Sequence, residues 1–181
     1  MAGNRRIVVA GGPGAGKTTL LLALHARGYT IAPDSARIII KERKSRGLSP
    51  RPEPPEFAYD VLRMDIDHYR ATPVQDNFVF FERGIPDALG ALAQLGLLTP
   101  ADTGRYLSEF PYSRRMLVLP PWEEIYTTDD ERDQTFGESV RVHAAVCDWY
   151  TRCGYELIEV PRMPVDARCE FVLRTLERGD Q

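Results

Sequence analysis

The chain has 181 residues, of which 43% are hydrophobic, and this length and apolar content fit a single domain spanning residues 1–181. The formal net charge of -3 argues against a protein that binds nucleic acid or anionic membranes through overall basic charge. Three cysteines without a C-x-x-C pair, and no apolar run near the roughly 18 residues of a membrane span, predict a cytoplasmic protein with neither a disulfide framework nor a transmembrane helix.

Short apolar runs that end at glycine or proline alternate with stretches of helical spacing along the chain. The predicted strands are 6–10, 29–32, 78–81, 116–119 and 155–160, and the predicted helices are 17–27, 35–46, 57–70, 86–95, 100–109, 138–152 and 165–177. A proline-rich loop is expected at 47–55. Alternating strands and helices indicate a parallel sheet covered on both faces, so we expect an α/β fold: a three-layer sandwich around five parallel strands.

The first predicted strand is followed by a complete phosphate-binding loop of the form G-x-x-x-x-G-K-[ST], which opens a predicted helix. In such a loop the backbone N–H groups surround phosphate oxygens, Lys17 reaches the β and γ phosphates, and Thr18 ligates magnesium. A glycine-rich turn without a ligand would need the lysine, the hydroxyl and the strand–helix setting all to be coincidences. We therefore predict that ATP and Mg²⁺ bind through Gly11, Gly12, Pro13, Gly14, Ala15, Gly16, Lys17, Thr18 and Thr19.

Two charged residues follow the predicted strand at 78–81, at the edge of the sheet where parallel α/β proteins bind ligands. We expect Glu82 to hold magnesium or one of its water ligands, and Arg83 and Asp87 to contact a phosphoryl acceptor. The structural alternative is an ion pair at the strand end and a helix cap at Asp87. The position on the ligand-binding edge favours the functional interpretation.

Asp34 follows the second predicted strand on the same edge, and Arg37 lies one helical turn later on the same side. Phosphoryl transfer needs mainly positioning and charge stabilisation, so an aspartate that accepts the acceptor's proton is sufficient as a base. Asp34 is the predicted base and Arg37 a predicted acceptor contact. The competing interpretation is that Asp34 is only the N-cap of the next helix.

An acidic segment after the fourth strand contains Arg132 among several carboxylates. An arginine in a lid can fold over the phosphates as charge shifts in the transition state. We predict a lid at about residues 122–137 in which Arg132 is catalytic, the alternative being a solvated acidic loop with an incidental arginine.

A basic stretch lies beside the expected acceptor pocket and contains Lys41, Arg43, Lys44, Arg46 and Arg51. It could attract a phosphorylated or polyanionic acceptor. The more ordinary interpretation is a solvated helix end.

Four segments carry a family resemblance: the phosphate-binding loop, Asp34-Ser-Ala-Arg37, Glu82-Arg83-Gly84-Ile-Pro-Asp87 and Glu131-Arg-Asp-Gln-Thr-Phe136. Over nearly the whole chain it resembles the small AAA-type ATPases related to nicotinamide riboside kinase, within the P-loop kinases. The resemblance implies a five-stranded parallel core, a helical lid and ATP as phosphoryl donor. It also implies that adenine lies between Arg132 or its neighbours and the turn at 161–165. Many relatives carry glutamate at position 34 and aspartate at position 82, so the base and the magnesium ligand could be exchanged.

These residues predict an enzyme that transfers the γ-phosphoryl group of ATP to the hydroxyl of a small molecule, which could be anionic. No N-K-x-D motif reads a guanine base, which argues against a GTPase. Two alternatives stay open: a nucleotide sensor that hydrolyses ATP slowly or not at all, and a polynucleotide 5'-hydroxyl kinase. Net acidity and the lack of an aromatic–basic stacking surface argue against a nucleic-acid substrate.

Overall fold

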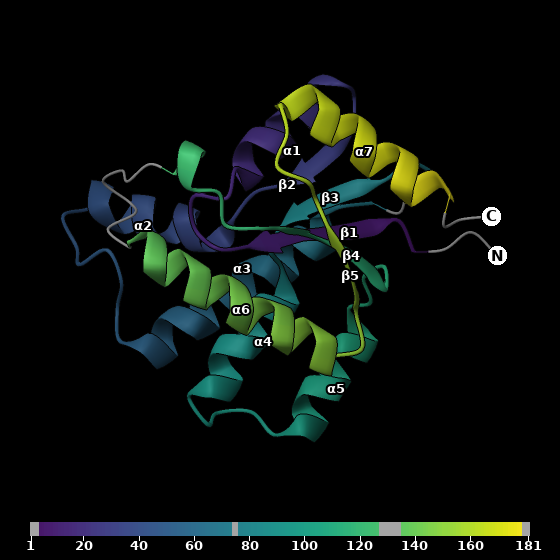
Figure 1. Cartoon of the computed structure of the whole chain (residues 1–181). Helices are drawn as coiled ribbons and strands as arrows, with labels where there is room; N and C mark the ends of the chain where they lie inside the picture. Colours follow the sequence, from purple (N-terminus) through teal and green to yellow (C-terminus); the bar gives the residue numbers. More distant parts are fainter. Residues whose placement is uncertain (1–3, 74–75, 127–134, 179–181) are drawn as a thin grey trace. The chain divides into compact units, whose positions relative to one another are not determined.

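The computed structural model describes residues 4–73, 76–126 and 135–178 (Figure 1). The described residues form one five-stranded parallel sheet in the order β2-β3-β1-β4-β5. The strands are β1 (Arg6–Gly11), β2 (Thr30–Ala32), β3 (Val79–Glu82), β4 (Arg115–Leu119) and β5 (Glu156–Glu159). The helices are α1 (Lys17–Ala26), α2 (Ser35–Ser45), α3 (Pro54–Ala71), α4 (Ile85–Gln94), α5 (Pro100–Glu109), the 3-10 turn η1 (Glu123–Ile125), α6 (Phe136–Arg152) and α7 (Val165–Arg178).

The chain divides into two compact units. The first comprises Met1–Ile31, Gln75–Glu82 and Tyr112–Gln181, and it contains α1, α6, α7 and nearly all of the sheet. The second comprises Ala32–Val74 and Arg83–Pro111, and it contains α2 to α5. The chain passes directly from Glu82 in the first unit to Arg83 in the second.

Three layers make up the first unit: α1 and α7 cover one face of the sheet, and α6 covers the other (Figure 1). On α7, Cys169, Val172 and Leu176 recur at helical spacing and are buried. They belong to a core that also contains Ile7, Val9, Leu20, Leu21, Leu24, Phe80, Leu117 and Leu119. Alternate residues of the central strands therefore point into this one core, as the two-residue period of a strand requires.

The register of the sheet brings the carboxyl ends of its central strands together. Val9 of β1 is level with Glu82 of β3, and Gly11 is level with Leu119 of β4. The loop that follows β1 therefore starts beside the end of β3, at the edge where parallel sheets bind ligands.

In the second unit, α3 packs between α2 and α4, and α5 packs against α4. Helix α3 begins at Pro54, whereas the sequence predicted a loop through residue 55 and a helix from residue 57. Proline is well accommodated in the first turn of a helix, because that turn has no intrahelical partner for its N–H groups. The proline-rich stretch therefore starts the helix instead of delaying it.

The other predicted strands and helices are confirmed within a few residues at their ends, and η1 is an element that the sequence analysis did not predict. The three cysteines are free thiols, as expected. Within the described ranges, no helix combines the length and the apolar character needed to cross a bilayer.

Candidate active site

The loop between β1 and α1 is too crowded for side chains at several of its glycines, Gly11 and Gly14 among them. A Cβ atom on Gly11, whose φ is 134°, would lie 2.5 Å from the carbonyl oxygen of Leu119. A Cβ atom on Gly14, whose φ is 76°, would lie 2.4 Å from Cδ2 of Tyr126. Glycine is needed at both positions because the backbone is left-handed and the neighbouring chain is close.

Lys17 is buried and turns back over the loop. Its Nζ donates hydrogen bonds to the carbonyl oxygens of Gly12 at 2.8 Å and Gly11 at 3.3 Å. The ammonium group is therefore held inside the loop, where a triphosphate would bind. Thr19, the last of the predicted nucleotide contacts, is exposed on α1.

Ser139 of α6 anchors the loop from outside, and the sequence analysis missed this residue. Its Oγ donates a hydrogen bond to the carbonyl oxygen of Pro13 at 2.6 Å, and the residue is fully buried. A serine in a helix 126 residues away from its partner carries no local sequence signal. Only the packing of α6 on the sheet reveals the contact.

The two predicted magnesium ligands lie together in the first unit. Thr18 Oγ1 donates a hydrogen bond to Glu82 Oε1 at 2.8 Å, and Glu82 is buried. A hydroxyl and a carboxylate are the hard oxygen donors that Mg²⁺ prefers. The described residues contain no cluster of three or more histidine, cysteine or acidic side chains suited to a metal. Nucleotide-bound Mg²⁺ takes its other ligands from phosphates and water, so this pair fits the ion.

In the second unit, Arg83 lies between two of the predicted acceptor-site carboxylates. Its Nε is 3.5 Å from Asp34 Oδ2, and its Nη1 is 3.3 Å from Asp87 Oδ1. Arg83 is also the one non-glycine residue with positive φ, at 63°, among the described residues. Such backbone geometry costs about 1–3 kcal/mol and is concentrated at functional sites. The structure thus brings together Asp34, Arg83 and Asp87.

Asp34 caps a helix and also contacts Arg83, and its role as the base stays a prediction. Its Oδ1 accepts a hydrogen bond from the backbone N–H of Arg37 at 3.3 Å, so it is the N-cap of α2. Its Oδ2 faces Arg83 instead. The half-buried side chain of Arg37 stays a predicted acceptor contact. Arg132 lies outside the described residues, as does half of the predicted lid.

Asp65 of α3 is a buried acid beside this cluster that the sequence analysis did not single out. Its Oδ1 accepts a hydrogen bond from Ser35 Oγ at 2.5 Å, and its buried Oδ2 has no partner among the described residues. The pKa of Asp65 is raised to about 8, mainly by burial and further by repulsion from Asp87 and Asp34. The hydrogen bond from Ser35 and the attraction of Arg83 lower this pKa, but by less. Asp65 is therefore a neutral acid at neutral pH.

A sequence signal for Asp65 does exist. The buried stripe of α3 consists of Ala58, Leu62, Asp65 and Tyr69, which follow helical spacing. An acid within an otherwise apolar stripe is expected to be functional or to be paired.

Replacing Asp65 with asparagine should remove a pH dependence of stability. Asp65 is ionised in the unfolded chain above about pH 4, because its unperturbed pKa is 3.8, but it stays protonated in the folded protein up to about pH 8. The folded state therefore binds one more proton than the unfolded chain between these pH values. As pH rises from 5 to 7, the contribution of Asp65 to the free energy of unfolding falls by about 1 kcal/mol per pH unit.

Urea unfolding of the wild type and of Asp65→Asn at several pH values measures this contribution as the difference between the two proteins. The control Glu56→Gln changes an exposed acid on the same helix. His68, whose pKa burial lowers, lies 3.2 Å from Ser35 Oγ and is present in all three proteins. Parallel pH profiles for wild type and Asp65→Asn would contradict the assignment of a neutral Asp65.

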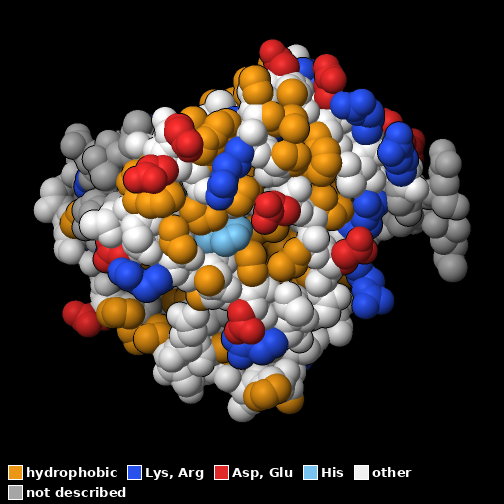
Figure 2. All heavy atoms as spheres, viewed as in Figure 1, with side chains coloured by type: hydrophobic (Ala, Val, Ile, Leu, Met, Phe, Trp, Pro, Cys, Tyr) orange, Lys and Arg blue, Asp and Glu red, His pale blue; other side chains and the backbone are white. Residues whose placement is uncertain are grey.

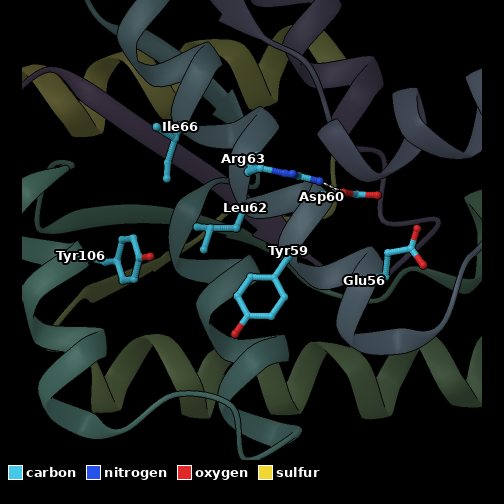
Figure 3. Close-up of a pocket in the computed structure, with 7 residues that line it drawn as sticks. All are labelled: Glu56, Tyr59, Asp60, Leu62, Arg63, Ile66 and Tyr106. Carbon is cyan, nitrogen blue, oxygen red and sulfur yellow. Dashed lines mark hydrogen bonds and ion pairs between the residues drawn. The ribbon is translucent and has the colours of Figure 1, made fainter.

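A separate pocket of about 400 Å³ in the second unit is lined by residues of α3 and α5 (Figure 3). Its walls are Glu56, Tyr59, Asp60, Leu62, Arg63, Ile66 and Tyr106, and the side chains of Arg63 and Asp60 point toward one another as an ion pair. None of the predicted site residues lines it. We therefore do not assign it to the acceptor.

Charges of both signs are interspersed over the face shown in Figure 2, with hydrophobic side chains between them. The described residues of this face carry no continuous basic surface of the kind that tracks a nucleic-acid backbone.

A sequence model of a family described as an AAA domain matches residues 6–168. The chain belongs to this family. No curated protein matches the sequence of this AAA domain.

Solved structures of nucleoside and nucleotide kinases have the same fold as this chain. Deoxyadenosine kinase from M. mycoides with bound dATP has a TM-score of 0.63 and 13% identity, covering 96% of this chain and 99% of that one. Thymidylate kinase from Candida albicans has a TM-score of 0.65 and 15% identity, covering 99% and 93%. Thymidylate kinase from Ehrlichia chaffeensis has a TM-score of 0.57 and 14% identity, covering 97% and 99%. The AAA domain therefore has the P-loop kinase fold, and the relation to nicotinamide riboside kinase stays a prediction.

Proposed function

We propose that this AAA domain is an ATP-dependent kinase that transfers the γ-phosphoryl group of ATP to a hydroxyl group of a small molecule. One observation carries the proposal. Glu82, hydrogen-bonded to Thr18 of the phosphate-binding loop, is followed directly by Arg83, whose backbone φ is positive and whose guanidinium pairs with two carboxylates. A protein that only sensed nucleotide would need the first half of this arrangement but not the second.

Each residue then has a role in the reaction. The loop backbone and Lys17 hold the phosphates. Thr18 and Glu82 would hold Mg²⁺, which would supply positive charge to the phosphate oxygens. The acceptor oxygen forms a bond to the γ-phosphorus while the bond from the γ-phosphorus to the β,γ-bridging oxygen breaks. Asp34 takes the proton from the acceptor hydroxyl, Arg83 and Asp87 orient the acceptor, and ADP leaves. Arg132 stays the predicted lid arginine.

The charge of the second unit's cluster favours an uncharged or cationic acceptor. Asp34 and Asp87 both contact the guanidinium of Arg83, and Asp65 adds a neutral carboxyl group nearby. The carboxylates of Asp34 and Asp87 would repel a phosphate group bound beside them. Lys41, Lys44 and Arg46 of the basic stretch are exposed, as expected of a solvated helix end.

We therefore infer that the acceptor is an uncharged molecule with several hydroxyl groups, such as a nucleoside, and not a nucleoside monophosphate. The solved structures of similar fold include both kinds of kinase. One is named for a nucleoside, deoxyadenosine, and another for a nucleoside monophosphate, thymidylate. A hydroxyl-rich, uncharged acceptor matches the hydrogen-bonding capacity of Asp34, Asp87 and the neutral Asp65.

Matched pairs of acceptors test the proposal. ADP formation is measured with deoxyadenosine against dAMP and with thymidine against dTMP, and the phosphorylated product is detected by mass. We expect a nucleoside to be phosphorylated faster than its monophosphate. Faster phosphorylation of the monophosphate in both pairs would contradict the inferred class of acceptor.

Arg83→Gly sharpens this test, because glycine accepts the positive φ of 63° while removing the guanidinium. The KM for the acceptor should rise by roughly tenfold or more, as expected for losing hydrogen bonds to a charged group, while the KM for ATP stays unchanged. An equal rise in both KM values would place Arg83 outside the acceptor site.

A further inference from the structure

The pocket lined by α3 and α5 has no part in the proposed reaction, although it has the size of a ligand site. Its volume of about 400 Å³ lies within the range of small-molecule sites, and all of its walls belong to the second unit (Figure 3). None of Asp34, Arg83 and Asp87 lines it. The pocket is therefore a candidate for a second ligand, different from the acceptor.

The body of the pocket is aromatic and aliphatic. Tyr59 of α3 and Tyr106 of α5 supply two rings, and Leu62 and Ile66 of α3 supply branched aliphatic groups. Leu62 is only 3% exposed, whereas Tyr59 is 42% exposed, so much of its ring is left in water. A ligand with an apolar body would remove this ring from water.

The charges of the side chains that line the pocket do not cancel. Arg63 is paired with Asp60, and Figure 3 shows the two side chains pointing toward one another. The exposed carboxylate of Glu56, in the first turn of α3, has no ion-pair or hydrogen-bond partner among the described residues. One negative charge is therefore left beside two tyrosine rings.

A carboxylate and the faces of tyrosine rings both attract cations. The guanidinium carbon of Arg105 already lies 5.6 Å from the ring centroid of Tyr106, although Arg105 is also paired with Asp102 and is not part of the pocket wall. An anion such as a phosphate would instead be repelled by Glu56. The surplus charge and the rings thus favour the same kind of ligand.

We propose that the pocket lined by α3 and α5 binds an organic cation, an ammonium or guanidinium group carried on an apolar body. The cationic group pairs with Glu56, and the body packs on Tyr59, Tyr106 and Leu62. Two sources have this chemistry: a free amine, and a lysine or arginine side chain of a protein partner. The inference is independent of the proposed function, because no residue of the phosphate-binding loop or of the acceptor cluster lines the pocket.

Three compounds with the same apolar body and different charges test the proposal: phenylbutylamine, phenylbutanol and phenylbutyrate. Each is titrated into the full-length protein labelled with ¹⁵N, and the backbone amide signals report both the affinity and the place of binding. We expect the amine to bind roughly fivefold more tightly than the alcohol, and to shift signals of α3 and α5. Added salt should weaken binding of the amine and leave that of the alcohol nearly unchanged.

Substitutions separate the charge from the aromatic wall. Glu56→Gln keeps the shape of the side chain, so we expect the affinity for the amine to fall to about that for the alcohol, which stays within about twofold. Tyr59→Ala should weaken the amine and the alcohol alike, by about threefold or more. The control Glu109→Gln removes an exposed carboxylate of α5 that does not line the pocket, and should change neither affinity. All three positions are exposed, and thermal unfolding checks that the variants fold.

The peptide acetyl-Phe-Lys-Phe-amide distinguishes the two sources of the cation. Tighter binding of the peptide than of phenylbutylamine would identify a basic protein segment as the ligand, and tighter binding of the amine would identify a free small molecule. Either result supports the proposal.

Three results would overturn the inference. Equal affinities for the amine and the alcohol would show that charge is not recognised. Tightest binding of phenylbutyrate would make Arg63 the partner of an anion. Signal shifts confined to residues outside α3 and α5 would place the site elsewhere. Binding is measured without ATP, so a failure of the proposed function leaves each of these results interpretable.

Discussion

Lys17→Met should reduce phosphoryl transfer by about 10²–10³, the loss typical of removing one positioned electrostatic group. The ammonium of Lys17 is buried within the loop, 2.8 Å from the carbonyl oxygen of Gly12. Methionine keeps the length of the side chain and leaves little cavity, so the loss should arise from missing charge on the phosphates and not from misfolding. Turnover and ATP affinity, measured side by side, check this expectation.

A matched control is Lys41→Met, which removes the same charge from the exposed end of α2. We expect it to leave turnover and the thermal unfolding midpoint unchanged. Transfer at the wild-type rate by Lys17→Met would show that the loop does not hold the reacting phosphates.

Asp34→Asn should lower turnover by about 10² or more while ATP affinity is retained. The substitution is nearly isosteric, and asparagine caps helices about as well as aspartate. The hydrogen bond from the backbone N–H of Arg37 should therefore survive, and the stability of α2 should change little. The group that is lost is the carboxylate that accepts the proton. Single-turnover rates with saturating ATP measure this step.

A magnesium titration of the Asp34 and Glu82 variants decides which of the two residues is the base. If Glu82 is the magnesium ligand, Glu82→Gln should raise the Mg²⁺ concentration needed for half-maximal rate, and Asp34→Asn should not. Asp102→Asn, in the first turn of α5, where Asp102 pairs with the N-cap residue Thr99, serves as the control for an aspartate-to-asparagine change at a helix start. Unaltered turnover in Asp34→Asn would remove it from the base role.

Much of the fold could be predicted because its signals are local. Each buried strand is a short apolar run ended by glycine, proline or a charged residue, and each helix has its own apolar spacing. The start of α3 at Pro54 and the turn η1 were missed. Prolines next to one another were interpreted as a loop, although the first turn of a helix accepts them.

The residues of the candidate site could be predicted only where they come directly after a strand in the sequence. Thr18 with Glu82, and Arg83 with Asp34 and Asp87, come together because parallel strands end at one edge of a sheet. Ser139 lies on a helix far along the chain from the loop that it contacts, so no spacing pattern could indicate it. Asp65 was detectable in principle, as an acid in an apolar stripe.

Transfer of label from ATP carrying ³²P in its γ-phosphoryl group tests the central claim most directly. The wild-type protein and Lys17→Met are incubated with Mg²⁺, labelled ATP and a panel of nucleosides, nucleoside monophosphates and 5'-hydroxyl oligonucleotides, and the products are separated. The account predicts label on a nucleoside-type acceptor with the wild type and almost none with Lys17→Met. Label found only in inorganic phosphate, at a rate that no acceptor changes, would contradict a kinase and favour the nucleotide sensor.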